Sequence, residues 1–457
     1  MRSVIISQLG LVALSSLALL AGCGDDEGGD EKACSPAEQT GCTSGLTCEE
    51  VEGAEPACFP PLHIKGRVYD LTKDSPIAAA HVVARDANGA AVSRVAATAA
   101  DGTYQLQVPA KRSADGKILE KKVTLRVDAS NYATFPQAPR EALPIEIAEA
   151  SGDLNLQSAA TDVGLIPLAD SAGLGWISGV VQAESPGGTL VVAGGATGVA
   201  DFDGGYTIFN VPAGEQEVRG YGNGLQLTPA NASVVAGKGS LNVNLASAGA
   251  AGAAVSGKVE IVNGGDGDTT SVILVVEDTF DEAVNRGESP RGLRVGDVSG
   301  DFTIADVPDG KYVVLAAFEN DFLVRDPDTS IGGTEIVHIT VAGKDFAIAE
   351  SFKITGAIGV QSPGKEDMEE VSGTPTFVWE DDSSEDHYEV RVYDALGTVI
   401  WEETNVPGVS GGETVSAAYA GPALKPGMIY QFRAISIGKD GIPISATEDL
   451  RGVFIYR

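Results

Sequence analysis

Apolar residues recur with a period of two through most of this 457-residue chain, which predicts β-strands rather than helices. The clearest strand follows a Gly turn, and Tyr206 and Ile208 lie on one of its faces. Nearly the same sequence motif, which we call the phrase, occurs three times, at residues 101–109, 203–214 and 299–310. Each copy consists of a Gly turn, an aromatic residue, an alternating strand and a Val-Pro stop.

The repeated phrase predicts a β-hairpin and not a catalytic loop. We expect Gly102, Gly204 and Gly300 to be structural turn residues, because glycine adopts a positive φ without a Cβ clash. The acidic and aromatic residues vary among the copies, whereas the Gly and the Val-Pro stay. In the second and third copies Val211 and Val307 are displaced by one residue, which predicts a bulge before the proline.

Three modules open in the same way, with an apolar residue, a spacer, a Gly, a spacer and a Val. The glycines are Gly66, Gly179 and Gly257. A glycine inside a strand indicates a bulge or another segment that crosses closely. We divide the region into module 1 (62–168), module 2 (174–246) and module 3 (253–353). The Ala- and Gly-rich stretch 246–254 predicts a linker between modules 2 and 3.

Module 1 carries further motifs: Gly-x-Val at 66–68, Pro-Ile-x-x-Ala-x-Val at 76–82, and Asp-Gly-x-Tyr-x-Leu at 101–106. In these it resembles the carboxypeptidase regulatory-like domain. The resemblance implies a seven-stranded transthyretin-like (prealbumin-like) β-sandwich with no catalytic residues to carry over. Modules 2 and 3 keep the opening Gly and the phrase but lack a clear Pro-Ile segment. The chain has no His-Glu-x-x-His zinc pattern.

The final domain, residues 357–457, has a different character. Its motifs are Pro-x-Phe-x-Trp at 375–379, Tyr-x-Val-x-Val at 388–392 and Leu-x-Pro-Gly-x-x-Tyr-x-Phe-x-Ala at 424–434. In order and spacing they resemble a fibronectin type III domain. The resemblance implies that Trp379 is the core tryptophan and Tyr430 a buried tyrosine. Trp401 alternates with Val399, so we expect it in the core and not on a sugar-binding platform.

The first residues are typical of a secretory leader. An apolar run follows Arg2 and ends at Cys23 in Leu-Ala-Gly-Cys, which resembles a bacterial lipobox. Residues 1–22 are then a lipoprotein signal peptide, and acyl chains such as palmitate on Cys23 anchor the chain to a membrane. An ordinary signal peptide with an incidental Cys is the alternative. Because Gly24 and not aspartate follows the Cys, outer membrane or cell surface is the favoured location within the cell envelope.

An acidic tether, residues 23–33, leads to a Cys-rich segment at 34–60. Four cysteines in so short an exported stretch predict two disulfides. Of the three pairings among Cys34, Cys42, Cys48 and Cys58, first-to-third with second-to-fourth is our guess, and the other two stay open. Zinc is the alternative, and the absence of a Cys-x-x-Cys pair disfavours it.

Composition agrees with this organisation. With 57 Gly, 22 Pro and 43% hydrophobic residues, the chain favours all-β modules with cores to bury. We therefore predict an all-β chain of tandem β-sandwich domains, three transthyretin-like and one fibronectin type III-like, after a small disulfide-rich segment. A net charge of −33 excludes nucleic acid as a partner.

Candidate chemistry is sparse. Four histidines occur in separate parts of the chain, without a nucleophile pattern nearby: His63, His81, His338 and His387. We therefore expect neither enzyme activity nor a cofactor. The acidic stretch 380–386 offers four weak Ca²⁺ candidates: Asp381, Asp382, Glu385 and Asp386. It lacks the spacing of a calcium loop, so an acidic turn is the favoured reading, and Asp266-Gly267-Asp268 is weaker still.

A charged insertion in module 3, residues 278–294, predicts a loop or short helix. Sandwich loops are common places for binding groups, but a solvated surface insertion is the favoured reading. The sequence as a whole predicts a non-catalytic, lipid-anchored surface protein that acts as a spacer, adhesion or protein-interaction module. A carbohydrate-binding lipoprotein is the alternative, and it requires exposed aromatic side chains on one sandwich face. The expected partners are the membrane and a protein or polysaccharide at the surface.

Overall fold

The computed structural model describes residues 34–457 apart from 37–38, 120, 138–139, 151, 153, 263–266, 283–284, 318–320, 326–335 and 410–413. The predicted leader, the acylated Cys23, the tether and Asp266 lie outside the described residues. Strands dominate the fold, and the helices among the described residues are three 3₁₀ turns: η1 (Ile147–Glu149), η2 (Ala159–Thr161) and η3 (Glu277–Thr279). Within the described ranges, no helix is long and apolar enough to cross a membrane.

Module 1 is a sandwich of two four-stranded sheets. One sheet contains β3 (Leu62–Asp70), β6 (Thr103–Val108), β10 (Asn155–Leu156) and β11 (Val163–Leu165). The other contains β4 (His81–Arg85), β5 (Ala96–Ala97), β8 (Lys122–Asp128) and β9 (Ile145–Glu146). Inward side chains of the two sheets, Ile64, Leu106 and Leu125 among them, form one core. The period-two pattern thus becomes the buried face of each strand.

Modules 2 and 3 each have nine strands in matching sheets, of five and four strands. The larger sheet of module 2 contains β12 (Leu174–Gln182), β15 (Gly205–Pro212), β17 (Leu225–Leu227), β19 (Gly239–Ser240) and β20 (Leu245–Ala250). The smaller contains β13 (Leu190–Ala193), β14 (Ala196–Val199), β16 (Gly214–Tyr221) and β18 (Ala230–Val234).

In module 3 the corresponding larger sheet contains β21 (Ala253–Val262), β24 (Asp301–Val307), β26 (Leu323–Arg325), β28 (Phe346–Ala347) and β29 (Phe352–Gly356). The smaller contains β22 (Thr270–Val276), β23 (Arg294–Val298), β25 (Gly310–Ala316) and β27 (Val337–Val341). The prediction of a linker at 246–254 is wrong. β20 runs to Ala250 and pairs with β17, and β21 begins three residues later, because small residues fit a paired strand as readily as a coil.

The final domain is a sandwich with a three-stranded and a six-stranded sheet. The first contains β30 (Val360–Ser362), β32 (Thr376–Glu380) and β35 (Thr414–Ala418). The second contains β31 (Glu369–Val371), β33 (His387–Asp394), β34 (Val399–Pro407), β36 (Ile429–Ile437), β37 (Pro443–Ala446) and β38 (Val453–Tyr456). Trp379 and Tyr430 are buried in its core, and Trp401 packs against that core, as predicted.

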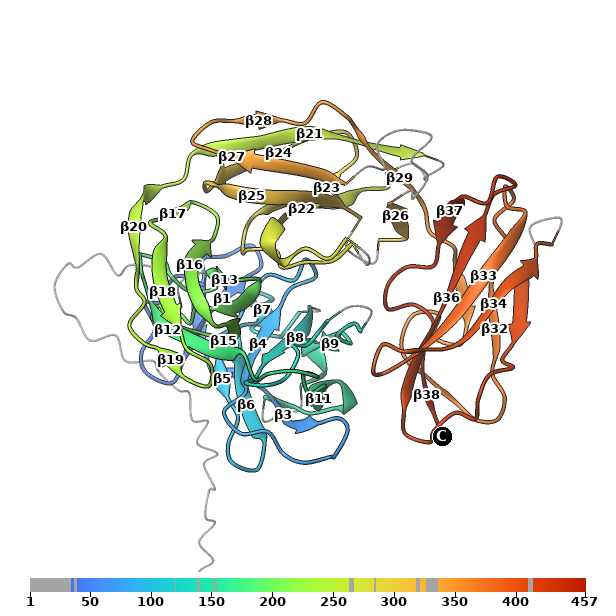
Figure 1. The fold of residues 1–457 in the computed structure, drawn as a ribbon, viewed down its shortest axis with the longest axis horizontal. Helices are drawn as coiled ribbons and strands as arrows, with labels where there is room; N and C mark the ends of the chain where they lie inside the picture. The colour runs from blue at the N-terminus through green and yellow to red at the C-terminus, as the bar shows by residue number, and fades with distance from the viewer. Residues whose placement is uncertain are drawn as a thin grey trace, which may run out of the picture.

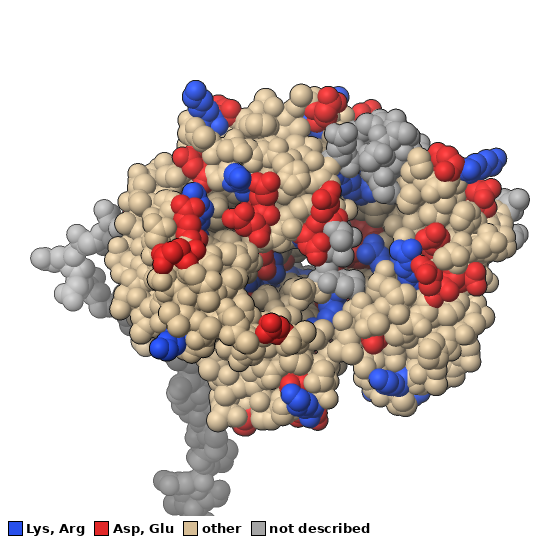
Figure 2. Space-filling view, in the orientation of Figure 1, with Lys and Arg blue, Asp and Glu red and all other residues tan. Residues whose placement is uncertain are grey.

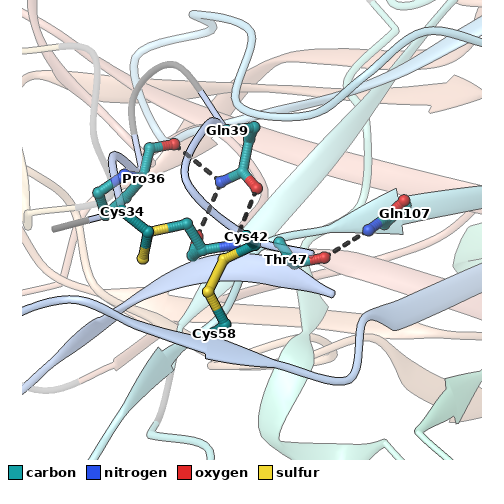
Figure 3. The surroundings of a disulfide bond; sticks show 8 residues. Cys34, Pro36, Gln39, Cys42, Thr47, Cys58 and Gln107 are labelled. Carbon is teal, nitrogen blue, oxygen red and sulfur yellow. Dashed lines mark hydrogen bonds between the residues drawn. A yellow bond between two sulfur atoms is a disulfide. The ribbon is translucent and has the colours of Figure 1, made fainter. Parts of the chain in front are cut away.

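The Cys-rich segment is a small hairpin of β1 (Thr47–Val51) and β2 (Ala57–Phe59), joined in parallel to β7 (Lys111–Arg112) of module 1. Disulfides connect Cys34 to Cys48 and Cys42 to Cys58, which is the first-to-third and second-to-fourth pairing. Figure 3 shows Gln107 of β6 reaching Thr47 of the hairpin through a hydrogen bond. The hairpin is therefore fixed to module 1.

In module 1 the opening glycine and the tyrosine of the phrase form one packing unit. A Cβ on Gly66 would lie 2.0 Å from the carbonyl oxygen of Thr161, far inside contact distance. The hydroxyl of Tyr104 donates a hydrogen bond to that same oxygen at 2.6 Å. A second segment therefore crosses directly over the glycine, as the glycine inside the strand predicted.

Modules 2 and 3 repeat this unit with a variation. A Cβ on Gly179 would lie 1.9 Å from the carbonyl oxygen of Val243, which accepts the hydroxyl of Tyr206. In module 3 the aromatic is Phe302, and its ring itself lies 2.8 Å from a Cβ on Gly257. The close approach is common to all three modules, whereas the hydroxyl hydrogen bond is not.

The turn glycines agree in their hydrogen bonds but not in their backbone conformation. The carbonyls of Gly102, Gly204 and Gly300 accept the N–H of Val68, Val181 and Val259 at 2.8, 2.9 and 2.8 Å. φ is +78° at Gly102 and +86° at Gly204, but Gly300 lies outside the left-handed region. The expectation of a positive φ at Gly300 is wrong; the nearby left-handed residue is Asp297, with φ +55°, which lies in β23 before the turn.

The bulges predicted before Val211 and Val307 are confirmed. The register of β12 with β15 shifts between Gly175 and Ile177, and that of β21 with β24 shifts between Ala253 and Val255. The extra residue in each bulge adopts a positive φ and is polar, with +58° at Asn210 and +56° at Asp306. Asn and Asp tolerate this conformation better than other residues with a side chain.

We expect Gly179→Ala to destabilise the protein strongly, because the new Cβ displaces the carbonyl of Val243 and breaks its bond to Tyr206. Gly252→Ala is a matched control, since a Cβ there meets nothing within 4 Å and its φ is not positive. Chemical denaturation of the two purified variants measures the difference. Equal stability of both variants would contradict the close crossing.

Candidate functional site

In Figure 1 module 2 lies at the left, module 3 at the top and the final domain at the right, with module 1 below module 3 and between the other two. Module 2 reaches module 1 through the polar residue in the bulge of its phrase. Asn210 donates through Nδ2 to the carbonyls of Ala129 and Tyr132 at 3.0 and 2.8 Å. Its Oδ1 accepts the N–H of Asn131 at 2.7 Å. The bulge of module 2 is therefore the docking point on the loop that follows β8.

Module 3 docks on module 2 in the same way. The carbonyl of Ala305 accepts Asn223 Nδ2 at 2.7 Å, and the carbonyl of Asp306 accepts the N–H of Gly224 at 2.8 Å. Asn223 and Gly224 follow β16, the counterpart of β8. The first phrase contacts the Cys-rich hairpin: Gln107 donates to Thr47 Oγ1, and Ala110, directly after the phrase, donates its N–H to Glu49 at 3.1 Å. Each phrase thus joins its module to the preceding element.

This repeated head-to-tail docking turns the chain back on itself, so that module 3 meets module 1. The guanidinium of Arg126, in β8, lies at the meeting point and is completely buried. It forms a bidentate pair with Asp128 at 2.8 and 2.9 Å and donates to Thr197 Oγ1 of module 2 at 2.7 Å. Its Nη1 lies 2.6 Å from a carboxylate oxygen of Glu288 in module 3. One side chain therefore contacts three modules.

Glu288 shares its second oxygen with Arg85, at 3.1 Å. Burial raises the pKa of this carboxyl, but Arg126 and Arg85 more than offset that effect, so its pKa lies below the ordinary value. Glu288 is thus ionised and held between two cations. The favoured reading of residues 278–294 as a solvated insertion is wrong at this position, because the docking of module 3 carries the loop into the centre of the molecule.

The same loop reaches the final domain. Arg286 forms ion pairs with Asp449 of the final domain and, at 3.3 Å, with Glu141 of module 1. Asp449 also pairs with Arg433 at 3.0 Å. No motif in the sequence marks Arg126 or Arg286 as a residue that joins modules. The one local signal was the i, i+2 spacing of Arg126 and Asp128, which places opposite charges on one face of a strand.

A cavity of about 1340 Å³ lies among the four sandwiches. Figure 2 shows it as a hollow near the centre of the visible face, with basic and acidic side chains along its wall. Its lining includes Arg140 of module 1, Asn210 of module 2, Glu288 of module 3 and Asp449 of the final domain. Among the described lining residues there is neither histidine nor cysteine. The wall therefore offers ion pairs and hydrogen-bonding groups but no nucleophile paired with an imidazole base.

The four histidines lie apart, each in its own surroundings. Burial lowers the pKa of His81, whose ring contacts Phe209 of module 2 edge-on at 5.0 Å. His338 and His387 lie 3.0 and 3.2 Å from Glu277 and Asp386. His63 is in β3, where burial and Lys65 lower its pKa. The described residues bring no two of these imidazoles together.

Carboxylates in the acidic stretch of the final domain accept hydrogen bonds from, or pair with, side chains of the same domain. Asp381 accepts the hydroxyl of Tyr388 at 3.1 Å, and Asp382 accepts that of Ser436 at 2.8 Å. Burial, with Asp381 and Asp382 nearby, raises the pKa of Glu385. Asp386 pairs with His387. In the described part of the chain, these carboxylates do not converge on one point, and we make no proposal of a calcium site.

A carboxyl of the final domain is buried where that domain meets module 3. Glu448 is 3% exposed, and its Oε1 accepts the N–H of Phe322 at 2.5 Å. Burial raises the pKa of Glu448 to about 7, and Asp321 adds to that increase, while the Phe322 N–H and Arg451 oppose it. This junction therefore contains a carboxyl that changes charge near neutral pH.

No protein-family model and no curated protein sequence matches this chain. Among solved structures, the Bacillus anthracis TIE protein is 11% identical over 83% of this chain and 68% of its own, with a TM-score of 0.17. A DUF3823 family protein from Bacteroides ovatus is 11% identical over 44% of this chain and 98% of its own, with a TM-score of 0.19.

The major pilin subunit BcpA of Bacillus cereus is 9% identical over 65% of this chain and 100% of its own, with a TM-score of 0.17. Such low scores carry no argument about what this chain does. Its function has to be inferred from its own residues.

We expect Arg126→Met to reduce stability by about 3–5 kcal/mol, because it leaves the carboxylates of Asp128 and Glu288 buried with fewer partners. Arg219→Met is the matched control, since Arg219 pairs with Glu217 on the surface of module 2. That change should cost no more than about 1 kcal/mol. Urea denaturation measures both, and a loss for Arg126→Met no larger than that of the control would refute its central role.

The carboxyl of Glu448 makes stability depend on pH. Its folded pKa of about 7 lies above the ordinary value of 4.5, so the folded protein binds this proton more tightly than the unfolded chain. The protonated carboxyl of Glu448 therefore contributes its full stabilisation below about pH 4.5. That stabilisation is lost as the pH rises from the ordinary pKa of 4.5 to the folded pKa of about 7.

Glu448→Gln keeps a hydrogen-bond acceptor and removes the charge. We expect it to raise the melting temperature by a few degrees at pH 8 and to leave it unchanged at pH 4. Glu403→Gln, an exposed change in the same domain, is the control. Scanning calorimetry across this pH range tests the sign, and a lower melting temperature of Glu448→Gln at pH 8 would reverse it.

Proposed function

We propose that this chain is a non-catalytic, lipid-anchored protein of the cell envelope whose sandwiches act together as one compact interaction body. The observation that carries the proposal is the pairing of buried charges across module boundaries, with Arg126 as its centre. Buried ionisable groups in an enzyme face a substrate, whereas these face one another and join modules. A chain folded into a ring also suits a platform better than the extended spacer that tandem domains otherwise make.

The location in the envelope rests on two features of the sequence. Leu-Ala-Gly-Cys, ending at Cys23, follows an apolar run and supports lipidation. The two disulfides of the Cys-rich segment support an oxidising compartment, where such bonds persist. The membrane is then the partner of the anchor, and a protein at the surface is the partner of the body.

We assign modules 1 to 3 to the carboxypeptidase regulatory-like type and the final domain to the fibronectin type III type. Support for the first comes from the position of β3 between β6 and the late strands β10 and β11, which β12 and β21 repeat. Support for the second comes from Trp379, buried between the two sheets of the final domain. Neither type brings catalytic residues.

Carbohydrate binding, the alternative, has less support. Trp379 is buried, Trp401 packs on Phe377 and Tyr419, and Trp176 lies against Gly239. Among the described large apolar side chains that are exposed, Phe322 is the one aromatic, and it lies beneath the guanidinium of Arg451. A flat aromatic platform for a sugar ring is thus absent from the described surface.

Fractionation of cells that carry Cys23→Ala tests the anchor. We expect the variant to leave the membrane fraction or to remain unprocessed, whereas Ser15→Ala, in the same leader, should behave as wild type. Protease treatment of intact cells tests the exposure of the body and should release it. Unchanged membrane association of Cys23→Ala would refute the lipid anchor, and complete protection from protease would refute display at the surface.

A further inference from the structure

The junctions of the ring differ in their chemistry. Modules 2 and 3 share an apolar core, because Leu190, Val192 and Tyr221 of module 2 belong to the same buried cluster as the core of module 3. Tyr221 also contacts Tyr312 edge-on, with ring centroids 5.8 Å apart. Such a junction depends on the hydrophobic effect and is insensitive to moderate salt.

The final domain shares no such core with its neighbours. Within the described residues, its buried cluster contains side chains from Ile358 onward and none from modules 1 to 3. Polar contacts attach it instead: Ser445 Oγ donates to the carbonyl of Gly356 at 2.7 Å, and Glu448 accepts the N–H of Phe322. The chain crosses between module 3 and the final domain once, after β29 ends at Gly356.

Arg286 forms ion pairs with Asp449 of the final domain and with Glu141 of module 1, and these side chains are about a quarter exposed. Side chains of Arg286, Asp449 and Glu141 are 28%, 25% and 25% exposed. Those of Arg126 and Glu288, which join modules 1 and 3, are 1% and 16% exposed. Salt screens exposed charges far more effectively than buried ones, because mobile ions have to approach them. Rising ionic strength should therefore weaken the contact through Arg286 and spare the cluster around Arg126.

We propose that the ring opens at one place: the final domain swings away from Arg286 of module 3 about the connection after Gly356, while modules 1 to 3 remain docked. The final domain supplies Asp367, Met368 and Asp449 to the wall of the central cavity. Opening therefore widens access to the cavity and separates Arg286 from Asp449. This inference concerns the motion of the body and does not depend on the lipid anchor.

Distances between spin labels test the motion in the full mature chain. One pair, Ala148→Cys with Thr398→Cys, spans module 1 and the final domain. A second pair, Ala148→Cys with Lys344→Cys, spans modules 1 and 3, and all three positions are exposed. The mean distance of the first pair should lengthen and its distribution broaden between about 0.05 M and about 1 M salt, where the Debye length falls to about 3 Å. The second pair should not change.

Arg286→Ala should lengthen the first distance at low salt, without added ions. Arg219→Ala, which removes a surface ion pair of module 2, should have no effect. Near-native melting of Arg286→Ala shows that its sandwiches remain folded, so an unfolded variant cannot mimic opening. An unchanged first distance in Arg286→Ala and at high salt would overturn the proposal. Equal lengthening of both pairs would overturn it as well, because the whole ring would then loosen.

Discussion

The arrangement of the modules depends on one buried guanidinium. Arg126 is completely shielded from water. The free-energy cost of this desolvation is offset only when all of its hydrogen-bonding and ion-pair partners are present. Those partners come from its own strand, from module 2 and from the loop of module 3. A small rotation of any module would leave a buried charge unpaired. We therefore regard this cluster as a source of specificity in the docking more than of net stability.

The repeated phrase places the modules so that this cluster can form. Its strand and turn build each sandwich, and its end joins that sandwich to the preceding element. Bulges in the second and third copies put Asn210 and Asp306 in the left-handed conformation at the contact. Because the second contact repeats the first, the chain continues to turn in the same sense and returns to module 1. The phrase thus forms part of each sandwich and also docks that sandwich on the preceding element.

Two kinds of junction result from this geometry. Modules 2 and 3 are joined by apolar side chains. Module 1 is joined to both of them through the buried guanidinium of Arg126. The final domain, whose core is separate, is held by polar contacts, and among these the pair of Arg286 with Asp449 is open to water and salt. Glu448 adds a carboxyl that titrates near neutral pH at the same junction. The cavity at the centre is lined in part by residues of these contacts, among them Arg286, Glu288 and Asp449.

Local sequence determined the elements of this protein. Period-two apolar residues defined the strands, Gly66 and Gly179 indicated the crossing segments, and Trp379 indicated the core of the final domain. These features were readable because a strand's own pattern records which of its faces is buried. The disulfide count followed from cysteines alone, whereas their pairing required the hairpin of β1 and β2.

Tertiary structure alone decided what the polar residues do. Arg126, Arg286 and Glu288 have the sequence context of exposed charges, and no local pattern shows that another module covers them. Residues 246–254 look like a linker because strand pairing of small residues depends on a partner elsewhere in the chain. The docking of one module on the next is a property of two surfaces that are distant in sequence. For this reason the sequence predicted the sandwiches, and only the folded chain placed them around a buried charge.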